Sequence, residues 1–101
     1  MNSDHKNCGM AKTLKIIGSK WTMLLLHHLF SGEKRFGELQ RSLDGISPKT
    51  LSQRLHELEK DGIIKKKVFA EIPLHVEYSL TRKGQSLNDI FKKLNDWGKK
   101  S

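Results

Sequence analysis

The sequence predicts a mainly helical chain with one small β-hairpin. Three observations support this fold class: apolar residues recur at helical spacing before residue 62 and after residue 81, they alternate in between, and glycines separate the periodic segments. A spacing of i, i+4 and i+7 marks one face of a helix, whereas alternation marks a strand buried on one side. Residues 1–101 are expected to form one domain, with residues 1–7 disordered.

Two helices are expected near the N-terminus. Met10, Leu14 and Ile17 recur at i, i+4 and i+7 in a first helix that ends at Gly18. Ser19 is a suitable N-cap for the second helix. Its apolar positions cover a wide surface, so this helix is expected to be the most buried: Trp21, Met23, Leu24, Leu25, Leu26, Leu29 and Phe30.

The segment from Gly45 to Gly62 predicts a short amphipathic helix with well-defined ends. Ser47 is a good N-cap, and Pro48 suits the first helical position because proline has no N–H to leave unpaired. Gly62 supplies the left-handed residue that ends the helix. Its core-facing stripe consists of Leu51, Leu55 and Leu58.

The outer face of this helix, with Lys49, Thr50, Gln53 and His56, and its flanks, with Ser52 and Arg54, carry side chains suited to DNA. Such groups read base edges or hold phosphates when a helix enters the major groove. The candidates are Lys49, Thr50, Ser52, Gln53 and Arg54. An ordinary solvated helix face is the alternative for this element taken alone.

The preceding segment turns this helix into part of a larger motif. After a basic turn at 33–35, Phe36, Leu39 and Leu43 predict a third, short helix, which Asp44-Gly45 breaks. A short helix, a glycine-containing turn and a capped second helix are typical of a helix-turn-helix. Arg35, before the third helix, is a further candidate for a phosphate contact.

Two strands follow Gly62, with a loop at 71–74 that contains Pro73. A hairpin in this position is the wing of a winged helix-turn-helix. Lys65, Lys66 and Lys67 make it basic, but strand alternation means that all three cannot face one partner. Lys66 and the tip residue His75 are the candidate DNA contacts, and solvent-facing solubility is the alternative for the lysines.

One last helix is expected over residues 82–100, capped by Thr81. Its long apolar stripe needs a partner. The preferred partners are the same helix and the first helix of a second copy of the chain. Packing within the chain is the alternative. The expected dimer-interface residues are Leu14 on the first helix and Leu87, Ile90, Phe91, Leu94 and Trp97 on the last.

Composition narrows the function. Nineteen Lys and Arg against eleven Asp and Glu give a formal charge of +8, which favours nucleic acid or an anionic membrane surface as partner. No apolar run is long enough to span a bilayer and no signal peptide is evident, so a cytoplasmic protein is expected. No metal or cofactor site is expected, because Cys8 is the only cysteine and adjacent His27 and His28 cannot share a metal.

The ordered motifs resemble the HxlR-type winged helix-turn-helix transcription regulators over nearly the whole chain. The resemblance rests on Cys8 and on the segments IGSKWTMLLL, RFGEL, GISPKTLSQRLHELEKDG, VEYSLT and DW. It implies a homodimeric DNA-binding regulator whose first and last helices form the interface. It also implies that the Cys8 position senses oxidants or electrophiles in some members. The chain departs from the family at Gly9, where proline is common, and at Leu74-His75, where a more basic wing tip is common.

The sequence therefore predicts a DNA-binding regulator that acts as a homodimer on a pseudo-palindromic promoter site. Cys8 precedes the first helix, where the helix dipole favours a thiolate, and is the candidate redox sensor. The alternative is an unreactive thiol. The rival function is a winged helix used as a protein-interaction module. A small metal-dependent enzyme using Asp61, His56 or the His27-His28 pair lacks a convergent cluster.

Overall fold

The helices and strands follow the predicted order in a computed structural model, which describes residues 8–101. The expectation of disorder at 1–7 lies outside the described residues. The elements are α2 (Gly9–Ile17), α3 (Lys20–Leu29), β1 (Lys34–Arg35), α4 (Phe36–Ser42), α5 (Pro48–Lys60), β2 (Ile64–Phe69), β3 (His75–Leu80), α6 (Arg82–Gln85) and α7 (Asn88–Lys100).

The predicted helix ends are confirmed. The Ser19 hydroxyl accepts a hydrogen bond from the Thr22 N–H at 3.0 Å at the start of α3. The Ser47 hydroxyl does the same for the Thr50 N–H at 3.1 Å at the start of α5. After α5, Gly62 has φ +75°, a left-handed conformation that favours glycine. Side-chain caps and a glycine stop therefore fix both the start of α3 and the full extent of α5.

The sheet has one more strand than expected. Its order is β1-β3-β2, and both pairings are antiparallel. Residues Lys34 and Arg35, expected in a basic turn, pair with Tyr78 and Glu77 of β3. A strand of two residues is too short to show a period, so only the approach of β3 reveals it.

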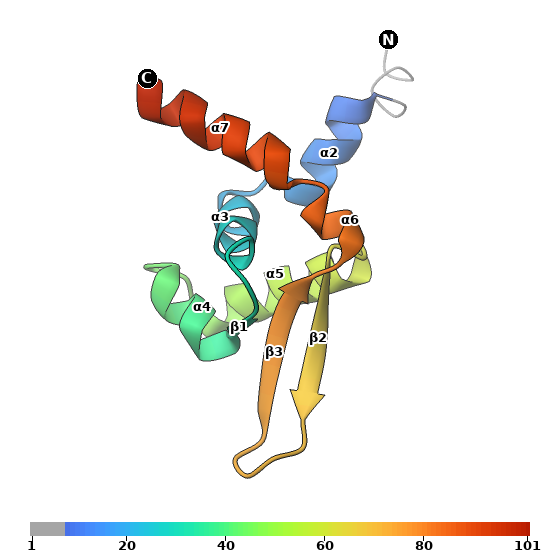
Figure 1. The fold of residues 1–101 in the computed structure, drawn as a ribbon, viewed down its shortest axis with the longest axis vertical. Coiled ribbons are helices and arrows are strands. Elements are labelled where there is room, and N and C mark those ends of the chain that lie inside the picture. Colours follow the sequence, from blue (N-terminus) through green and yellow to red (C-terminus); the bar gives the residue numbers. More distant parts are fainter. Residues whose placement is uncertain (1–7) are drawn as a thin grey trace.

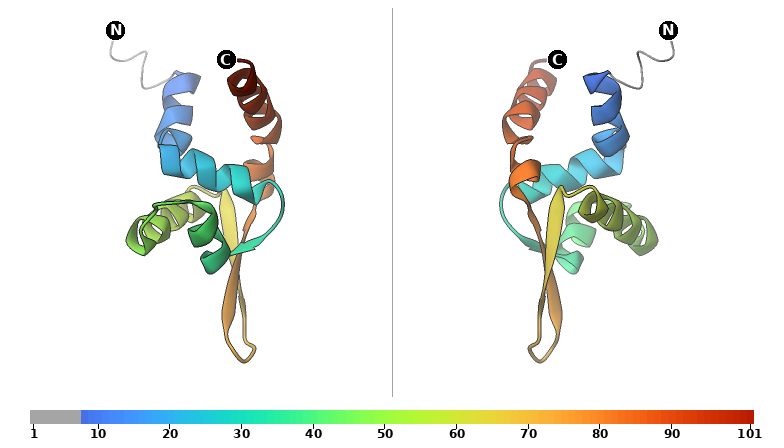
Figure 2. Two further views of the ribbon diagram at one scale, coloured as in Figure 1. Left: turned by 90° about the vertical axis from the view of Figure 1, so that its left-hand side faces the viewer. Right: turned by 90° about the vertical axis from the view of Figure 1, so that its right-hand side faces the viewer.

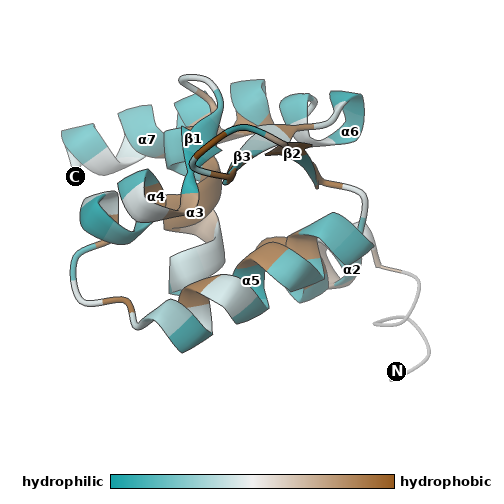
Figure 3. Cartoon of the chain, turned by 90° about the horizontal axis from the view of Figure 1, so that it is seen from below, coloured by the Kyte–Doolittle hydropathy of each residue, from teal (hydrophilic) through white to brown (hydrophobic). Residues whose placement is uncertain are grey.

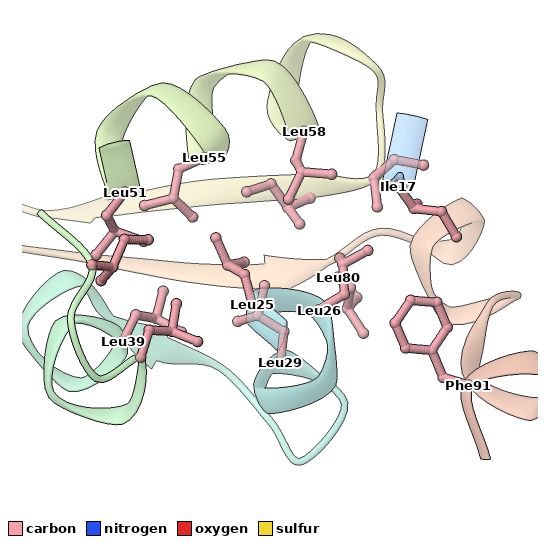
Figure 4. Close-up of a cluster of buried hydrophobic side chains, with 14 residues drawn as sticks. Ile17, Leu25, Leu26, Leu29, Leu39, Leu51, Leu55, Leu58, Leu80 and Phe91 are labelled. Carbon is pink, nitrogen blue, oxygen red and sulfur yellow. The ribbon is translucent and has the colours of Figure 1, made fainter. Parts of the chain in front are cut away.

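The core lies between α3, α4, α5 and the sheet. Figure 4 shows the leucines of α5 pointing toward Leu25, Leu26 and Leu29 of α3. Leu24 of α3 is exposed, contrary to the expectation, and Thr22 is buried instead. Because Thr22 shares a hydrogen bond with the capping Ser19 hydroxyl, its own hydroxyl is satisfied there.

The expected C-terminal helix is broken into α6 and α7. Thr81 caps α6 as predicted, its hydroxyl accepting from the Gly84 N–H at 3.1 Å. A Cβ at Gly84 would lie 2.2 Å from the Ile63 carbonyl oxygen, so α6 sits directly against the start of β2. The chain then turns at 86–87, and α7 leaves in a new direction (Figure 1).

The arrangement separates two ends of the molecule. Helices α2 and α7 extend to one end, and the β2–β3 hairpin projects from the opposite end (Figures 1 and 2). Helices α4 and α5 lie beside the base of the hairpin. Within residues 8–101, no helix is both long and apolar enough to cross a membrane.

Candidate nucleic-acid interface

The helix-turn-helix consists of α4, a turn at 43–47 and α5. Gly45 has φ +89°, which allows the chain to reverse between the helices. The side-chain amide of Gln40 on α4 donates a hydrogen bond to the Ile46 carbonyl in this turn. Ile46 itself is buried in the core. The Gln40 hydrogen bond and the burial of Ile46 therefore hold the turn in place, and so set the angle between α4 and α5.

The outer face of α5 is exposed in the part of the chain that the structure describes. Lys49, Ser52, Gln53 and His56 are exposed, while Leu51, Leu55 and Leu58 on the inner face are almost fully buried. In Figure 3, hydrophobic (brown) and hydrophilic (teal) turns alternate along α5. The structure thus brings together the predicted contacts Lys49, Ser52 and Gln53. It adds His56, which the sequence placed on this face without naming it as a contact.

Thr50 has a double role at the start of α5. Its side chain is half-buried, and its hydroxyl accepts a hydrogen bond from the Ser47 hydroxyl at 2.9 Å. The Thr50 hydroxyl proton remains available to donate outward.

Arg54 lies on a flank of α5, as the helical spacing predicted, and engages its own chain, while its DNA contact stays a prediction. Its guanidinium forms an ion pair with Glu57 at 3.0 Å, and its Nε is buried. The side chain lines a cleft beside Lys15 and Ser19, at the turn between α2 and α3. The helical wheel left Arg54 on a flank, and the packing of α2 and α3 decided which way it turned.

Lys66 and Arg35, the two candidates outside α5, are exposed near the base of the wing. Lys66 pairs with Tyr78 across the β2–β3 ladder, and Arg35 pairs with Glu77 on the other edge of β3. Burial, and then the nearby Glu59 of α5, raise the pKa of Tyr78 above its ordinary value of 10.0. The Tyr78 face of the wing is the one that continues into the core, since Ile64 and Leu80 on the same face are buried.

His75 does not project freely from the wing tip, contrary to the expectation. Its ring stacks on Phe69 with centroids 4.5 Å apart, and only 13% of its side chain is exposed. Its nitrogens lie 3.2 Å from a Glu77 oxygen and 3.8 Å from a Glu71 oxygen. Lys67 completes the group by lying 5.0 Å over the Phe69 ring. His75 therefore packs within the hairpin, where its ring contacts Phe69, Glu71 and Glu77.

The expected interface residues divide into two groups. Phe91 is 6% exposed and packs edge-on against Phe30 with ring centroids 5.2 Å apart, so it belongs to the core of its own chain. Leu87 is half-buried against that core. This corrects the expectation for Phe91, because the break before α7 points part of the stripe inward. The exposed members are Leu14 on α2 and Ile90, Leu94 and Trp97 on α7. Met10, one turn before Leu14 on α2, is also exposed.

Cys8 is exposed at the N-cap position of α2. Its carbonyl accepts a hydrogen bond from the Lys12 N–H at 3.1 Å, the first bond of the helix. The thiol makes no capping hydrogen bond. It is therefore accessible, and it sits on the helix that also carries Leu14.

The hairpin beside an exposed, polar second helix of a helix-turn-helix defines the winged helix-turn-helix class. Comparison with known proteins specifies the family. The HxlR-like helix-turn-helix model matches residues 16–101, so the chain belongs to the HxlR family of transcriptional regulators. The HTH-type transcriptional regulator YdeP of Bacillus subtilis (strain 168) is 41% identical over 99 residues, covering 98% of this chain and 77% of YdeP. Such regulators are DNA-binding proteins, not enzymes.

Solved structures agree with this assignment. The redox regulator HypR in its oxidized form has a TM-score of 0.89 and 39% identity, over 93% of this chain and 97% of that chain. Diamide-treated YodB from B. subtilis has a TM-score of 0.76 and 35% identity, over 92% of this chain and 93% of that chain. The predicted family and fold class are therefore confirmed.

Proposed function

We propose that the protein regulates transcription as a homodimer on a pseudo-palindromic promoter site, with α5 in the major groove and the wing beside it. The exposed outer face of α5 carries this proposal. The leucines on its inner face are buried in the core and hold the helix in place. The exposed side chains on its outer face are Lys49, Ser52 and Gln53. A formal charge of +8 supplies the attraction to phosphates.

The exposed apolar residues of α2 and α7 support the homodimer. Ile90, Leu94 and Trp97 are 51%, 48% and 72% exposed and recur at i, i+4 and i+7 along α7. An apolar stripe of this kind on a helix is a self-association surface in many soluble proteins. It lies at the end of the molecule opposite the wing, so pairing there leaves both α5 helices free (Figure 2). Two such helices would read half-sites about 34 to 36 Å apart.

Footprinting is the experiment that tests this function. The purified full chain is incubated with DNA upstream of its own gene and of the divergently oriented neighbour. We expect one protected region with two-fold symmetry. Affinity should fall steeply with salt, with a log-log slope of about −0.9 per phosphate contact, so ~6 to 10 contacts lose ~10³ to 10⁵ in affinity between 50 and 200 mM salt. Absence of protection, or a flat salt response, would favour the rival function of a protein-interaction module.

We also propose that Cys8 makes DNA binding sensitive to oxidants. Its thiol is exposed at the start of α2, beside the surface proposed for dimerisation. Diamide would oxidise the Cys8 thiols of two chains to one disulfide, itself taking up the two hydrogens. HypR is described as a redox regulator and YodB was solved after diamide treatment, which supports the proposal by similarity.

The matched test compares wild type with Cys8→Ser. Diamide should change operator affinity in wild type, and a reducing thiol should restore it. Cys8→Ser should bind DNA as untreated wild type does and show no response. Equal responses of the two proteins to diamide would remove Cys8 from the mechanism.

A further inference from the structure

Helix α7 turns one largely polar face back toward its own chain. Asn88, Phe91, Lys92 and Asn95 recur at i, i+3, i+4 and i+7, which places them on one side of the helix. All four line a hollow of about 480 Å³ between α7 and the end of α3. A helix face that meets its own domain is normally apolar, yet only Phe91 is apolar here. One wall of the hollow therefore carries amide and ammonium groups.

The floor of the hollow is aromatic. Phe30 and Phe91 both line it, and their rings pack edge-on with centroids 5.2 Å apart at an interplanar angle of 63°. Figure 4 shows the Phe91 ring at the border of the leucine core. A third planar ring can join such a pair by offset or edge-on contact. This floor therefore suits a flat, ring-containing ligand.

The side chains around the hollow are basic. His27 and His28 line it from the last turn of α3, with ring centroids 5.7 Å apart, and Lys92 lines it from α7. Within residues 8–101, no Asp or Glu lines it. Burial lowers the pKa of His28, and the charges of His27 and Lys34 lower it further. An anion placed among these groups is attracted and meets no carboxylate.

The carbonyls at the end of α3 do not offer a competing negative site. The C-terminal carbonyls of a helix carry the negative end of its dipole and repel anions when they are unpaired. Here the carbonyls of Leu26, His28 and Leu29 all accept hydrogen bonds from backbone N–H groups of residues 30–32. A ligand in the hollow therefore meets basic side chains at this helix end.

From these observations we propose that the hollow binds a small aromatic carboxylate. Its ring would lie on Phe30 and Phe91, and its carboxylate would accept hydrogen bonds from Lys92 and His28. A volume of about 480 Å³ falls within the range of ~300 to 1,000 Å³ that is typical of ligand sites. The ligand would contact both α3 and α7. Because α7 also carries the stripe proposed for dimerisation, the ligand would alter operator affinity, a regulatory role that rests on the proposed function.

Ligand binding is tested on the full chain without DNA, with 2-naphthoate as the probe. Its amide, 2-naphthamide, has the same ring and nearly the same shape but carries no charge. Calorimetry should show that 2-naphthoate binds about tenfold more tightly than 2-naphthamide or better, because only the carboxylate accepts charge-assisted hydrogen bonds. In an amide NMR spectrum, the side-chain NH₂ signals of Asn88 and Asn95 should shift when 2-naphthoate is added.

Two neighbouring lysines of α7 provide the matched control. Lys92 lines the hollow and Lys93 does not, and both are exposed, so replacing either with Gln removes one charge without disturbing the core. Lys92→Gln should weaken 2-naphthoate binding about tenfold, and Lys93→Gln should bind as wild type does. His28→Gln removes the second basic group and should also weaken binding. Circular dichroism checks that the three variants are folded.

The regulatory role is measured by repeating the footprinting titration with 2-naphthoate present. The operator affinity of wild type should change, whereas that of Lys92→Gln should stay the same at the same 2-naphthoate concentration. A wild-type operator affinity that does not respond, although calorimetry shows binding, would overturn the regulatory role.

Two results would overturn the ligand site itself. One is 2-naphthoate binding no more tightly than 2-naphthamide, with no binding of either up to about 10 mM as the extreme case. The other is equal affinity of Lys92→Gln and Lys93→Gln for 2-naphthoate. If wild type gives no footprint on promoter DNA, the proposed function and the regulatory role fail together, and calorimetry alone decides whether the hollow binds an aromatic carboxylate.

Discussion

Lys49 and Gln53 stand one turn apart on the exposed face of α5 but offer different chemistry to DNA. An amide can donate to and accept from one adenine edge, so it distinguishes bases. An ammonium is a mobile point charge that binds any phosphate. The exposed face therefore combines a sequence-reading group with a sequence-independent one.

Replacing these residues should separate specificity from charge. Gln53→Ala is expected to lose ~1 to 3 kcal/mol of preference for the operator over random duplex, with the salt slope unchanged. Lys49→Ala should weaken binding to both DNAs and reduce the slope by about 1. Competition titrations at several salt concentrations measure both quantities.

Arg54→Ala serves as the control for position on the helix. Because its guanidinium pairs with Glu57 instead of standing on the outer face, the salt slope should change less than in Lys49→Ala. A slope change equal to that of Lys49→Ala would mean that Arg54 leaves Glu57 when DNA binds.

His28 makes folding sensitive to acid. Burial, and then the neighbouring charges of His27 and Lys34, lower the pKa of His28 below its ordinary value of 6.5. At pH values below about 6.5, the His28 side chain is therefore protonated to a greater extent in the unfolded chain than in the folded chain. Stability is full above pH 6.5 and declines as the pH falls through the folded-state pKa.

The expected result is a smaller acid effect in His28→Gln. Urea unfolding at pH 7 and pH 5 should show a larger drop in midpoint for wild type than for the variant. Groups that do not interact with His28 contribute equally to both proteins and cancel in the comparison. Identical drops would assign the acid sensitivity to other residues.

At the level of elements, α6 couples the wing to the C-terminal helix. The Thr81 N–H donates to the Ile63 carbonyl at 3.0 Å, and the Thr81 hydroxyl donates to the Gly62 carbonyl at 2.6 Å. Lys83 Nζ reaches the Asp61 carbonyl at 3.2 Å. The end of α5, the start of β2 and α6 thus form one hydrogen-bonded junction, and Gly84 allows its close packing.

Three glycine substitutions test this junction by denaturant unfolding. Gly98→Ala in α7 meets no neighbour and should be neutral or stabilise the chain by ~0.5 to 1 kcal/mol. Gly62→Ala has free space but a left-handed backbone and should cost ~1 to 2 kcal/mol. Gly84→Ala must displace the Ile63 carbonyl and should cost roughly 3 kcal/mol or more. A Gly84→Ala protein as stable as Gly98→Ala would show that α6 is not docked as described.

Considered as a whole, the molecule carries exposed apolar side chains at both ends. One set is on α2 and α7 and the other on the wing, with the polar outer face of α5 between them. Phe91 is not part of the first set, because it anchors α7 to α3 through Phe30. Phe91 therefore ties the first turn of α7 to its own chain, and Ile90, Leu94 and Trp97 remain exposed on the outer side.

Leu94→Asp should disrupt the proposed dimer. A buried carboxylate at a two-fold interface is unpaired and meets its own symmetry copy. We expect a monomer by light scattering and a loss of operator affinity of about 10²-fold or more, since the two half-sites are no longer bound together. Asn95→Asp adds the same charge to α7 without removing an apolar group and should remain dimeric. If Leu94→Asp is still a dimer, the interface lies elsewhere.

The sequence by itself determined the positions of α3, α4 and α5, the caps of α3 and α5, and the inner face of α5. The helix ends depend on residues close in sequence, namely Ser19, Ser47 and Gly62. The leucine stripe of α5 repeats within a single helix, so local spacing predicts both the helix ends and the stripe. For the same reason the outer face with Lys49 and Gln53 could be predicted, because it is the face that the leucines leave exposed.

Only the tertiary structure decided how these elements meet. Lys34 and Arg35 form a strand because β3 passes beside them, Arg54 lines a cleft with Lys15 and Ser19 of the α2–α3 region, and Phe91 packs on Phe30. These outcomes depend on contacts between residues far apart in the chain, which no local period records. His75 is likewise held by Phe69 across the hairpin, a pairing that only the β2–β3 register brings about.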